Sequence, residues 1–322
     1  MEVLVTGAAG FIGSNLVNSL LNQNKIIVGI DKDYNGRKRL DNLMKYKDDM
    51  YMYSTNLVSK NFKMIWDNIN KIMSYHYCFD DIDTVYHLAA ASDIKKSLTD
   101  TSWDFENNIL GTHSVLEMMR KKDIKNIVFT STSALYGENP PMPTPENTPL
   151  EGLSLYSASK ICGEFLIKAY CELYGIKGYI FRFGNVVGKN QHRGVIYDFI
   201  QKLKNNPKRL EILGDGQQVK SYVHVSDVIN AMLTIPKKVK KNVDVFNIAT
   251  YDWIDVTSLA NILCKELKLK PDYYYTGGNK GWKGDIPKIQ LSIEKALNIG
   301  WAPEYNCEEA IRKAIGEIND NS

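Results

Sequence analysis

A glycine-rich heptapeptide near the N-terminus constrains the fold of this chain more than any other feature. Residues 7–13 read Gly-Ala-Ala-Gly-Phe-Ile-Gly and separate an apolar run from a helical pattern. The first glycine permits a tight turn, the second lets the backbone approach a pyrophosphate, and the third lets the helix pack closely on the strand. The first N–H groups of the helix can then bind the anion. We therefore predict a dinucleotide site formed by Gly7, Gly10, Phe11, Ile12 and Gly13.

Apolar runs of strand length alternate with helical patterns through the first part of the chain. Strands that are apolar on both faces and separated by helices are typical of a parallel sheet covered on both sides. We predict an α/β fold with a Rossmann-like doubly wound parallel sheet over residues 1–184. The expected strands are Glu2–Thr6, Lys25–Asp31, Met50–Tyr53, Thr84–Leu88, Asn126–Ser131 and Gly178–Arg182, and the expected helices are Phe11–Leu21, Phe62–Ser74, Trp103–Arg120 and Leu155–Leu173.

The pattern loosens after residue 184. We predict a smaller C-terminal α/β substrate-binding portion over residues 185–322, interleaved with the first. Its expected helices are Val195–Lys204, Val225–Ile235 and Val256–Leu267, with short strands at Leu210–Leu213 and Val245–Ile248. The proline-rich stretch Asn139–Leu150 is expected to be a loop.

An acidic residue ends the second predicted strand. Asp31 lies 18 residues beyond Gly13. A carboxylate at this place accepts hydrogen bonds from the ribose hydroxyls of a dinucleotide and repels a 2′-phosphate. Asp31 therefore favours NAD over NADP, and the nearby Arg37 can weaken that preference.

A tyrosine and a lysine are spaced four residues apart in the predicted helix Leu155–Leu173. Residues i and i+4 lie on one helix face, so Tyr156 and Lys160 project side by side. A nearby ammonium favours the charged form of a phenol, whose unperturbed pKa is ~10. A tyrosine with a lowered pKa can act as a general base near neutral pH. The same spacing also occurs on solvated helices, so its interpretation depends on the surrounding sequence.

Hydroxyl side chains gather at the end of the fifth predicted strand, from Thr130 to Ser133. The carboxyl ends of parallel strands face the crevice in which ligands bind. A hydroxyl there can form a hydrogen bond with a substrate alcohol or carbonyl. Thr and Ser are equally common as strand-end caps, so the run alone leaves both interpretations open.

The composition excludes several functional classes. A net charge of +3 is too small to indicate nucleic acid, and there is no apolar run long enough to span a membrane. The five cysteines form neither a CxxC pair nor a cluster with metal-binding spacing, so we expect reduced thiols and no metal. The first residues read as an apolar strand without a basic leader, and a cytoplasmic protein is expected.

The dinucleotide loop, the strand-end hydroxyl and the Tyr-x-x-x-Lys segment follow one another in this order. In this arrangement the chain closely resembles the extended short-chain dehydrogenase/reductase family, and within it the nucleotide-sugar epimerases and dehydratases. It is most similar to the UDP-glucose 4-epimerase branch, in particular its archaeal-type members. Further stretches that carry the resemblance are Val85–Ala90, Asn108–Thr112, Phe181–Gly188, Gly214–Gly216, Val219–Asp227 and Gly300-Trp301.

The resemblance implies NAD as the cofactor, a nucleotide-sugar such as a UDP-hexose as the substrate, and roles for individual residues. Thr132 fills the catalytic Ser/Thr position, Tyr156 is the base and Lys160 anchors the cofactor ribose. Further cofactor-binding residues would be Asn56, Leu57, Leu88, Ala89, Ala90, Asn108 and Phe183. Substrate-binding residues would be Ser92, Thr132, Ser133, Tyr156, Asn185, Gly194, Val195, Lys220, Tyr222 and Lys283, whereas His87 is expected to be a satisfied core residue.

Three positions depart from the family pattern. Asn56 stands where relatives usually have an acid near the adenine. Lys220 replaces a diphosphate-binding arginine and loses its bidentate fork. Trp282 takes the place of a second arginine, so Lys280 or Lys283 would have to neutralise the second phosphate.

The residues after Thr132 bear on the reaction. By resemblance, relatives that dehydrate carry Asp-Glu there and relatives that decarboxylate carry Ser-Glu, the glutamate of the dehydratases removing a C5 proton. This chain has Ser133 and Ala134, and a methyl group cannot move protons. Without a second base, the expected outcome is that a 4-keto sugar turns over and receives the hydride on its opposite face. The resemblance therefore implies 4-epimerisation with NAD retained.

Three alternatives remain. A reductase or dehydratase would use a base elsewhere, such as Glu138 or Cys162. A non-catalytic NAD-binding regulator would share the fold. A uronate 4-epimerase needs a cation near C6, and Arg193 could supply it.

The resemblance also implies a homodimer, formed through the predicted helices Trp103–Arg120 and Leu155–Leu173. The apolar positions on the first of these helices fit that interface and fit packing on the sheet equally well. They are Ile109, Val115, Leu116, Met118 and Met119.

Overall fold

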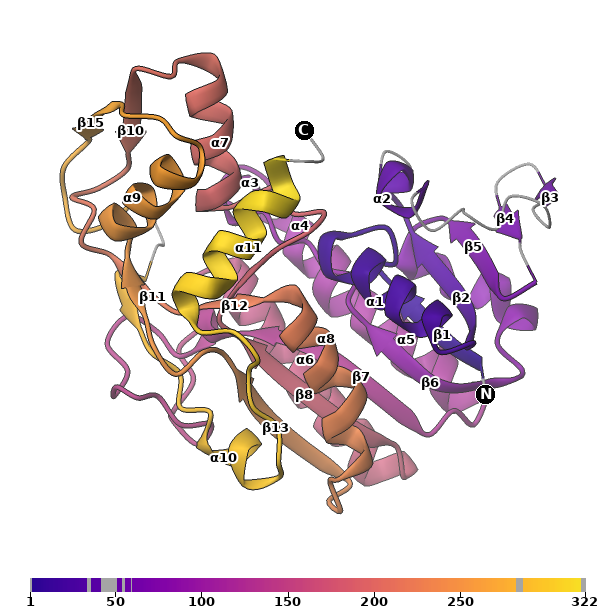
Figure 1. The fold of residues 1–322 in the computed structure, drawn as a ribbon. Helices are drawn as coiled ribbons and strands as arrows, with labels where there is room; N and C mark the ends of the chain where they lie inside the picture. The colour runs from indigo at the N-terminus through magenta and orange to yellow at the C-terminus, as the bar shows by residue number, and fades with distance from the viewer. Residues whose placement is uncertain are drawn as a thin grey trace. The chain divides into compact units, whose positions relative to one another are not determined.

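A large sheet, ordered β13-β8-β7-β6-β1-β2-β5-β4-β3, organises the fold (Figure 1). The computed structural model describes residues 2–33, 36–41, 51–53, 56–58, 60–281 and 286–319. Its strands pair in parallel from β5 through β2, β1 and β6 to β7. The prediction of a Rossmann-like doubly wound sheet is confirmed. The strands of this sheet are β1 Glu2–Thr6, β2 Ile26–Asp31, β3 Tyr51–Tyr53, β4 Asn56–Val58, β5 Phe62–Trp66, β6 Ile82–His87, β7 Asn126–Thr132, β8 Lys177–Phe183 and β13 Val243–Ile248.

The chain divides into two units, each made of separate segments. The first unit comprises residues 1–131, 154–181 and 239–245, and the second comprises 132–153, 182–238 and 246–322. The functional division at residue 184 stays a prediction.

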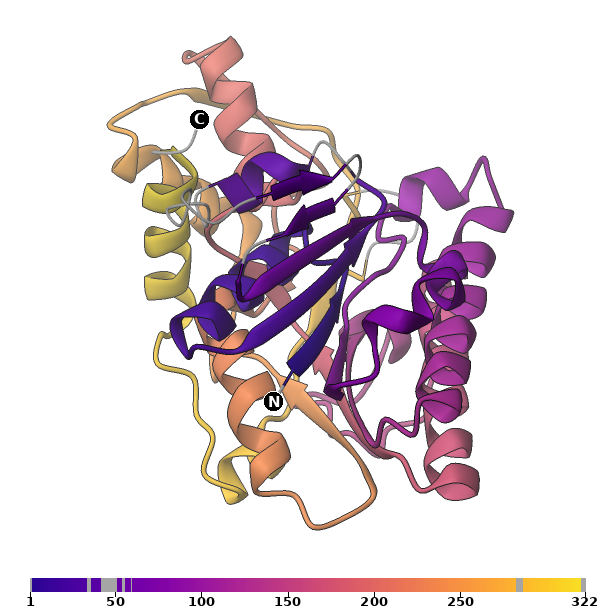
Figure 2. The same ribbon diagram turned by 90° about the vertical axis from the view of Figure 1, so that its right-hand side faces the viewer.

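In the first unit, helices cover both faces of the sheet. Helix α1 (Phe11–Asn22) lies on one face, and α5 (Gly111–Lys121) and α6 (Leu155–Tyr174) lie on the other (Figure 2). The side chains of Val115, Leu116, Met118 and Met119 have no exposed surface and belong to the apolar core of this unit. These four positions, whose sequence fits an interface and packing on the sheet equally well, therefore pack inside the protomer. The shorter helices of the unit are α2 Arg37–Asp41, α3 Ile94–Ser97, α4 Ser102–Asp104 and the 3₁₀ segment Ile69–Cys78.

The strands described in the second unit form three small sheets. Strand β9 (Asn185–Val187) pairs in parallel with β12 (Tyr222–His224), and β10 (Arg209–Ile212) pairs with β15 (Asp272–Tyr275). Strand β11 (Val219–Lys220) lies between β14 (Ile254–Asp255) and β16 (Lys288–Ile289). The helices are α7 Val195–Asn205, α8 Val225–Thr234, α9 Val256–Glu266, α10 Glu294–Asn298 and α11 Cys307–Asn319, with 3₁₀ turns at Ser133–Leu135 and Ile235–Lys237.

Four sequence predictions need correction. The expected helix Phe62–Ser74 is wrong, because Phe62–Trp66 forms β5 and continues the parallel sheet beside β2. A short, mostly apolar segment fits either structure, and pairing with the open edge of β2 decides it here. Strand β3, expected among the parallel strands, instead pairs antiparallel with β4 at the sheet edge. The run Val245–Ile248 belongs to β13 of the large sheet, and a π-helical segment at Phe105–Leu110 interrupts the expected helix Trp103–Arg120.

The strand order reverses at β1. The chain adds β2 and β5 on one side of β1, and then β6 and β7 on the other. At such a switch point the loops that follow neighbouring strands diverge and leave a ligand-binding crevice. The loops after β1 and β6 are therefore where a ligand is expected. No helix among the described residues has the length and apolar character needed to cross a bilayer.

Candidate active site

The glycine loop after β1 is as crowded as its sequence predicts. Gly7 has φ +71°, and a Cβ on it would lie 2.8 Å from the backbone nitrogen of Ala89. A Cβ on Gly13 would lie 2.0 Å from the carbonyl oxygen of Gly7. Gly10 caps α1 without any side-chain hydrogen bond to the helix. The first N–H groups of α1 thus remain available to an anion, as a pyrophosphate site requires.

Asp31 ends β2 and reaches the same loop. Its Oδ2 accepts the N–H of Ala9 at 3.0 Å, and its Oδ1 accepts the N–H of Asp33 at 2.9 Å. Burial raises the pKa of Asp31, and these two hydrogen bonds act against that rise. A carboxylate has about four acceptor positions, so one partner on each oxygen leaves room for ribose hydroxyls.

Arg39 is a contact of this loop that the sequence did not single out. Its guanidinium donates to the carbonyl of Ala9 at 2.5 Å and lies 3.7 Å from Asp33. The predicted neighbour, Arg37, begins α2, and its side chain lies outside the described residues. Neither sequence spacing nor composition distinguishes the two arginines.

The loop after β6 is fixed by buried polar residues. The His87 ring lies between the hydroxyls of Thr6, at 2.8 Å, and Thr112, at 3.0 Å. Burial and the charge of Lys160 lower the pKa of His87 to about 3, so the ring is neutral. This arrangement confirms the expected core histidine. Next along the loop, Leu88 and Ala89 are half-buried, whereas Ala90 and Ser92 are exposed.

Asn108 connects this loop to α6. Its Oδ1 accepts the N–H of Ala91 at 2.7 Å, and its Nδ2 lies 2.8 Å from Ser159 Oγ and 3.1 Å from Asp104 Oδ1. The amide therefore holds the loop in place, and direct contact of Asn108 with a cofactor stays a prediction.

Helix α6 presents the Tyr-x-x-x-Lys pair. Ser154 and Ser157 form a reciprocal capping box, so Tyr156 lies in the first turn. Tyr156 is half-buried, whereas Lys160 is only 3% exposed. The Lys160 ammonium donates to the carbonyl of Thr130 at 2.9 Å and lies 4.7 Å from the Phe129 ring centroid. Burial lowers the pKa of Lys160 to about 8, while Glu164 and Asp104 oppose this change.

In the second unit, Thr132 ends β7 and caps a 3₁₀ turn. Its Oγ1 accepts the N–H of Ala134 at 3.2 Å. Thr132, Ser133 and Ala134 are all half-buried. Ala134 follows Ser133 directly after the carboxyl end of β7, and its side chain is only a methyl group.

The predicted substrate-binding residues of the second unit have different surroundings. Asn185 Nδ2 donates to the carbonyl of Ser221 at 3.3 Å and thus joins β9 to β12. Gly194, with φ +92°, caps α7, and Val195 begins that helix. Phe183 and Tyr222 are 6% and 3% exposed. Because Tyr222 packs within the apolar core of this unit, it has little surface to offer a substrate.

Several other predicted residues are only partly described. Asn56 and Leu57 lie in β4, but their side chains, like Lys283 and Trp282, fall outside the described residues. Lys280 forms an ion pair with Glu138 at 2.8 Å. Lys280 was considered as a cation for the diphosphate and Glu138 as an alternative base, and each is the ion-pair partner of the other.

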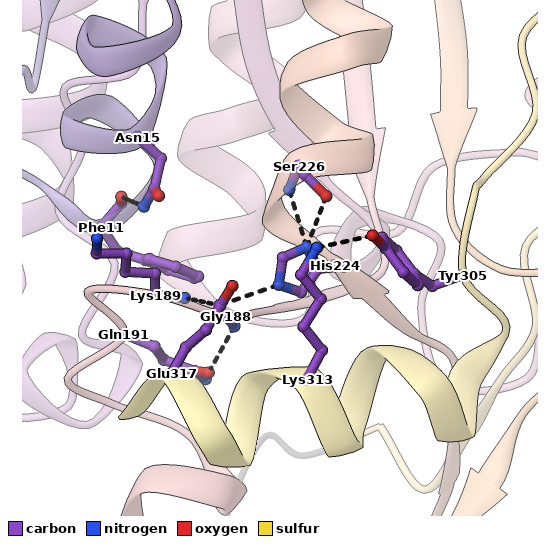
Figure 3. Close-up of polar contacts among 10 residues, drawn as sticks. All are labelled: Phe11, Asn15, Gly188, Lys189, Gln191, His224, Ser226, Tyr305, Lys313 and Glu317. Atoms are coloured by element: carbon purple, nitrogen blue, oxygen red, sulfur yellow. Dashed lines mark hydrogen bonds and ion pairs between the residues drawn. The ribbon is translucent and has the colours of Figure 1, made fainter. Parts of the chain in front are cut away.

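A polar cluster around Glu317, not predicted from the sequence, joins three parts of the second unit (Figure 3). Glu317 on α11 accepts the N–H of Lys189 at 2.7 Å and contacts His224 Nε2 at 3.1 Å. His224 Nδ1 accepts the N–H of Ser226 and caps α8. Gly188 is required beside them, because a Cβ there would lie 2.9 Å from His224 Nε2. The cluster thus holds the segment that leads to Gly194 and α7.

Known proteins match this chain over its whole length. The model of the NAD dependent epimerase/dehydratase family matches residues 3–249. A Methanocaldococcus jannaschii protein provisionally named UDP-glucose 4-epimerase is 35% identical and covers 99% of both chains. Human dTDP-D-glucose 4,6-dehydratase is 28% identical over 99% of this chain and 90% of its own.

Solved structures with similar folds include two epimerases. UDP-glucose 4-epimerase of Thermotoga maritima, solved with UDP-glucose, has a TM-score of 0.86 at 28% identity and covers 100% of this chain and 99% of its own. UDP-glucuronic acid 4-epimerase of Bacillus cereus, solved with UDP-glucuronic acid and NAD, has a TM-score of 0.86 at 26% identity and covers 100% of both chains.

Replacing Glu317 by Gln is expected to lower the free energy of unfolding at pH 7 by about 1 kcal/mol, because the hydrogen bonds from Lys189 and His224 lose their charged acceptor. Burial raises the pKa of Glu317, but the hydrogen bonds from His224 and Lys189 outweigh it and lower the pKa overall. Such a carboxyl stabilises the fold above its unfolded pKa and ceases to do so as the pH falls through its folded pKa. In urea unfolding, the difference between wild type and variant should therefore shrink below pH 4.5, the ordinary value.

The matched control is Glu308→Gln on the same helix. Glu308 forms an exposed ion pair with Arg312, which should contribute less than about 1 kcal/mol. A stability loss in Glu317→Gln that is the same at pH 7 and pH 4 would contradict the assignment.

Proposed function

Since this chain belongs to the NAD dependent epimerase/dehydratase family, we propose that it is a UDP-sugar 4-epimerase. It would invert C4 of UDP-glucose and UDP-galactose, or of their N-acetyl equivalents, through a transient 4-keto sugar. NAD is the cofactor of the family. The proposal rests on the sequence Thr132-Ser133-Ala134 at the end of β7, together with a complete Tyr-x-x-x-Lys segment in α6.

The residues of the first unit fit NAD. The uncapped start of α1 suits the pyrophosphate, Asp31 suits the adenosine ribose, and Lys160 suits the nicotinamide ribose. A side chain at Gly7 or Gly13 would fill this loop. When bound, NAD would supply hydride transfer at the sugar C4.

The residues of this chain then move the proton and hold the sugar oxygen. Tyr156 as phenolate removes the proton of the 4-hydroxyl, and Thr132 forms a hydrogen bond with the same oxygen. The Lys160 ammonium favours the phenolate form of Tyr156. When the hydride returns, Tyr156 gives the proton back, so one residue serves both half-reactions.

The position of Ala134 supports epimerisation over loss of water. Elimination from a 4-keto sugar requires removal of a second proton, and a group within hydrogen-bond reach must accept it. The half-buried methyl group of Ala134 follows Thr132 and Ser133, and it has no acceptor. Glu138, the alternative base, is paired with Lys280. We therefore expect the keto-sugar to be reduced from its opposite face.

The nucleotide-sugar would be held by the second unit. Lys220 supplies positive charge for the diphosphate, Asn185 an amide, and the Gly194-Val195 turn a surface for the base. The exposed Arg193 beside this turn keeps a uronate substrate as a second candidate, because a guanidinium binds carboxylate in a bidentate manner.

The proposal is tested by incubating the purified protein with UDP-glucose, UDP-N-acetylglucosamine and UDP-glucuronate, without added reductant. We expect the C4 epimer of at least one of the first two, with no net NADH. Conversion of UDP-glucuronate alone would identify the uronate candidate. Loss of water or carbon dioxide, or no conversion at all, would refute the proposal.

Tyr156→Phe is the matched variant for this assay. It removes one hydroxyl from the first turn of α6 and leaves Lys160 and the glycine loop unchanged. Turnover should fall by at least about 10²-fold, since general base catalysis contributes 10²–10⁴, while NAD stays bound. Full activity would show that another group is the base.

We also propose a homodimer formed by the outer faces of the π-helical segment and α6. Apolar side chains are exposed there, with Phe105 at 51%, Phe165 at 58% and Leu173 at 69%. Exposed apolar side chains that gather on one surface mark an interaction site. A second copy of this chain is the partner implied by the family resemblance.

Phe165→Glu should convert a dimer to a monomer, because it places a charge in the apolar interface. Sedimentation equilibrium measures the mass directly. Tyr77→Glu, at a residue 62% exposed on a different helix, should leave the dimer intact. A monomeric wild type, or a dimeric Phe165→Glu, would contradict this interface.

A further inference from the structure

The buried ammonium of Lys160 needs an anion to remain charged. Its hydrogen bond at 2.9 Å goes to the carbonyl of Thr130, and its other close neighbour is the ring of Phe129. Both groups attract a cation, but neither carries a full negative charge. Burying a charge without a paired counter-charge is costly, so the anions around Lys160 determine whether it keeps its proton.

Glu164 lies one helical turn after Lys160 on α6. Residues i and i+4 share a helix face, and both side chains are buried, Glu164 with no exposed surface and Lys160 with 3%. Glu164 Oε1 accepts the hydroxyl of Ser131 at 2.7 Å. Ser131 directly follows Thr130 in β7. Two consecutive residues of the central strand therefore hold the ammonium and the carboxylate.

The other titratable groups that face Lys160 come from three elements. Asp104 on α4 is 2% exposed and accepts hydrogen bonds from Ser97 and Asn108. His87 on β6 is neutral at physiological pH, and Tyr156 lies on α6 itself. Asp104 already accepts hydrogen bonds from two neutral donors. Glu164, in contrast, is the carboxylate that shares a helix face with the ammonium.

We propose that Glu164, held by Ser131, is a positioning residue that keeps Lys160 protonated and in place while Tyr156 exchanges its proton with the sugar. This inference rests on the proposed function, because it takes the roles of Lys160 and Tyr156 from it. Glu164 acts through Lys160 and touches neither the sugar nor the cofactor. Its effect is therefore on the pH range of activity.

The direction of that effect follows from the charges. Burial lowers the pKa of Lys160. The negative charge of Glu164 opposes this lowering more strongly than that of Asp104 does. Removing the negative charge lets the pKa of Lys160 fall further, so the ammonium loses its proton at a lower pH. The phenolate of Tyr156 then loses its cationic partner. In the pH dependence of kcat, the decline on the alkaline side therefore moves to a lower pH.

Glu164→Gln isolates the charge, because glutamine has nearly the same shape and keeps an oxygen that can accept the Ser131 hydroxyl. We expect the alkaline limb to move toward acid by about one pH unit, and kcat above that limb to fall by about tenfold. Glu164→Asp keeps the charge and should restore part of the profile. Glu172→Gln, at an exposed residue of the same helix, should leave the profile unchanged.

A second readout does not depend on turnover. In protein labelled with [13Cε]lysine, the Lys160 signal is identified by its absence from Lys160→Met, and its titration is followed by NMR. Glu164→Gln should lower the midpoint of this titration, and Glu172→Gln should not. A wild type that converts no sugar would refute the proposed function and leave this titration as the test of Glu164.

The proposal is overturned if Glu164→Gln leaves both the Lys160 titration and the kcat profile unchanged. A lower unfolding temperature with unchanged titration would show that Glu164 only ties α6 to β7. If Glu164→Gln does not fold, Ser131→Ala provides the same test with a smaller change, since it releases the carboxylate without removing it. The same unchanged titration in that variant would also overturn the proposal.

Discussion

The buried ammonium of Lys160, bonded to the carbonyl of Thr130, is the interaction on which the rest of the candidate site depends. It joins α6 to the C-terminal part of strand β7 and so sets where Tyr156 lies relative to the strand ends of the first unit. It also places a positive charge where burial opposes one. A group in this position is useful to a phenol that must lose and regain a proton, because its charge stabilises the phenolate.

The glycine loop meets a different constraint, which is steric. The backbone atoms of Gly7, Gly13 and Ala89 approach so closely that Cβ atoms cannot be accommodated at either glycine. This close approach leaves the uncapped start of α1 next to the loop after β6, at the switch point of the sheet. Charge and space are thus arranged for a dinucleotide.

Much of this could be predicted from the sequence where the chemistry is local. The glycine spacing, the strand-end Asp31 and the helical spacing of Tyr156 and Lys160 each depend on a few neighbouring residues. The helix predicted at Phe62–Ser74 failed because pairing with β2, a contact between distant segments, decided its structure. Glu164 and Glu317 were missed for the same reason, since Ser131 and His224 are far from them in sequence.

The roles of the substrate residues stay predictions, because they depend on surfaces that local patterns do not reveal. Tyr222 fits the family pattern, yet it packs in the core of the second unit. The apolar positions of α5 likewise fit an interface and are buried in the protomer. An alternation of apolar and polar residues identifies a buried face, but it does not say what covers that face.

In the proposed 4-epimerisation the hydride removed from C4 returns to the same carbon, and no second proton is removed. Converting a UDP-sugar deuterated at C4, in ordinary water, tests it most directly, together with the unlabelled sugar in deuterated water. We expect that the epimeric product keeps the deuterium at C4 and takes up none from solvent at C5. Loss of the C4 label to water, or solvent deuterium at C5, would contradict it.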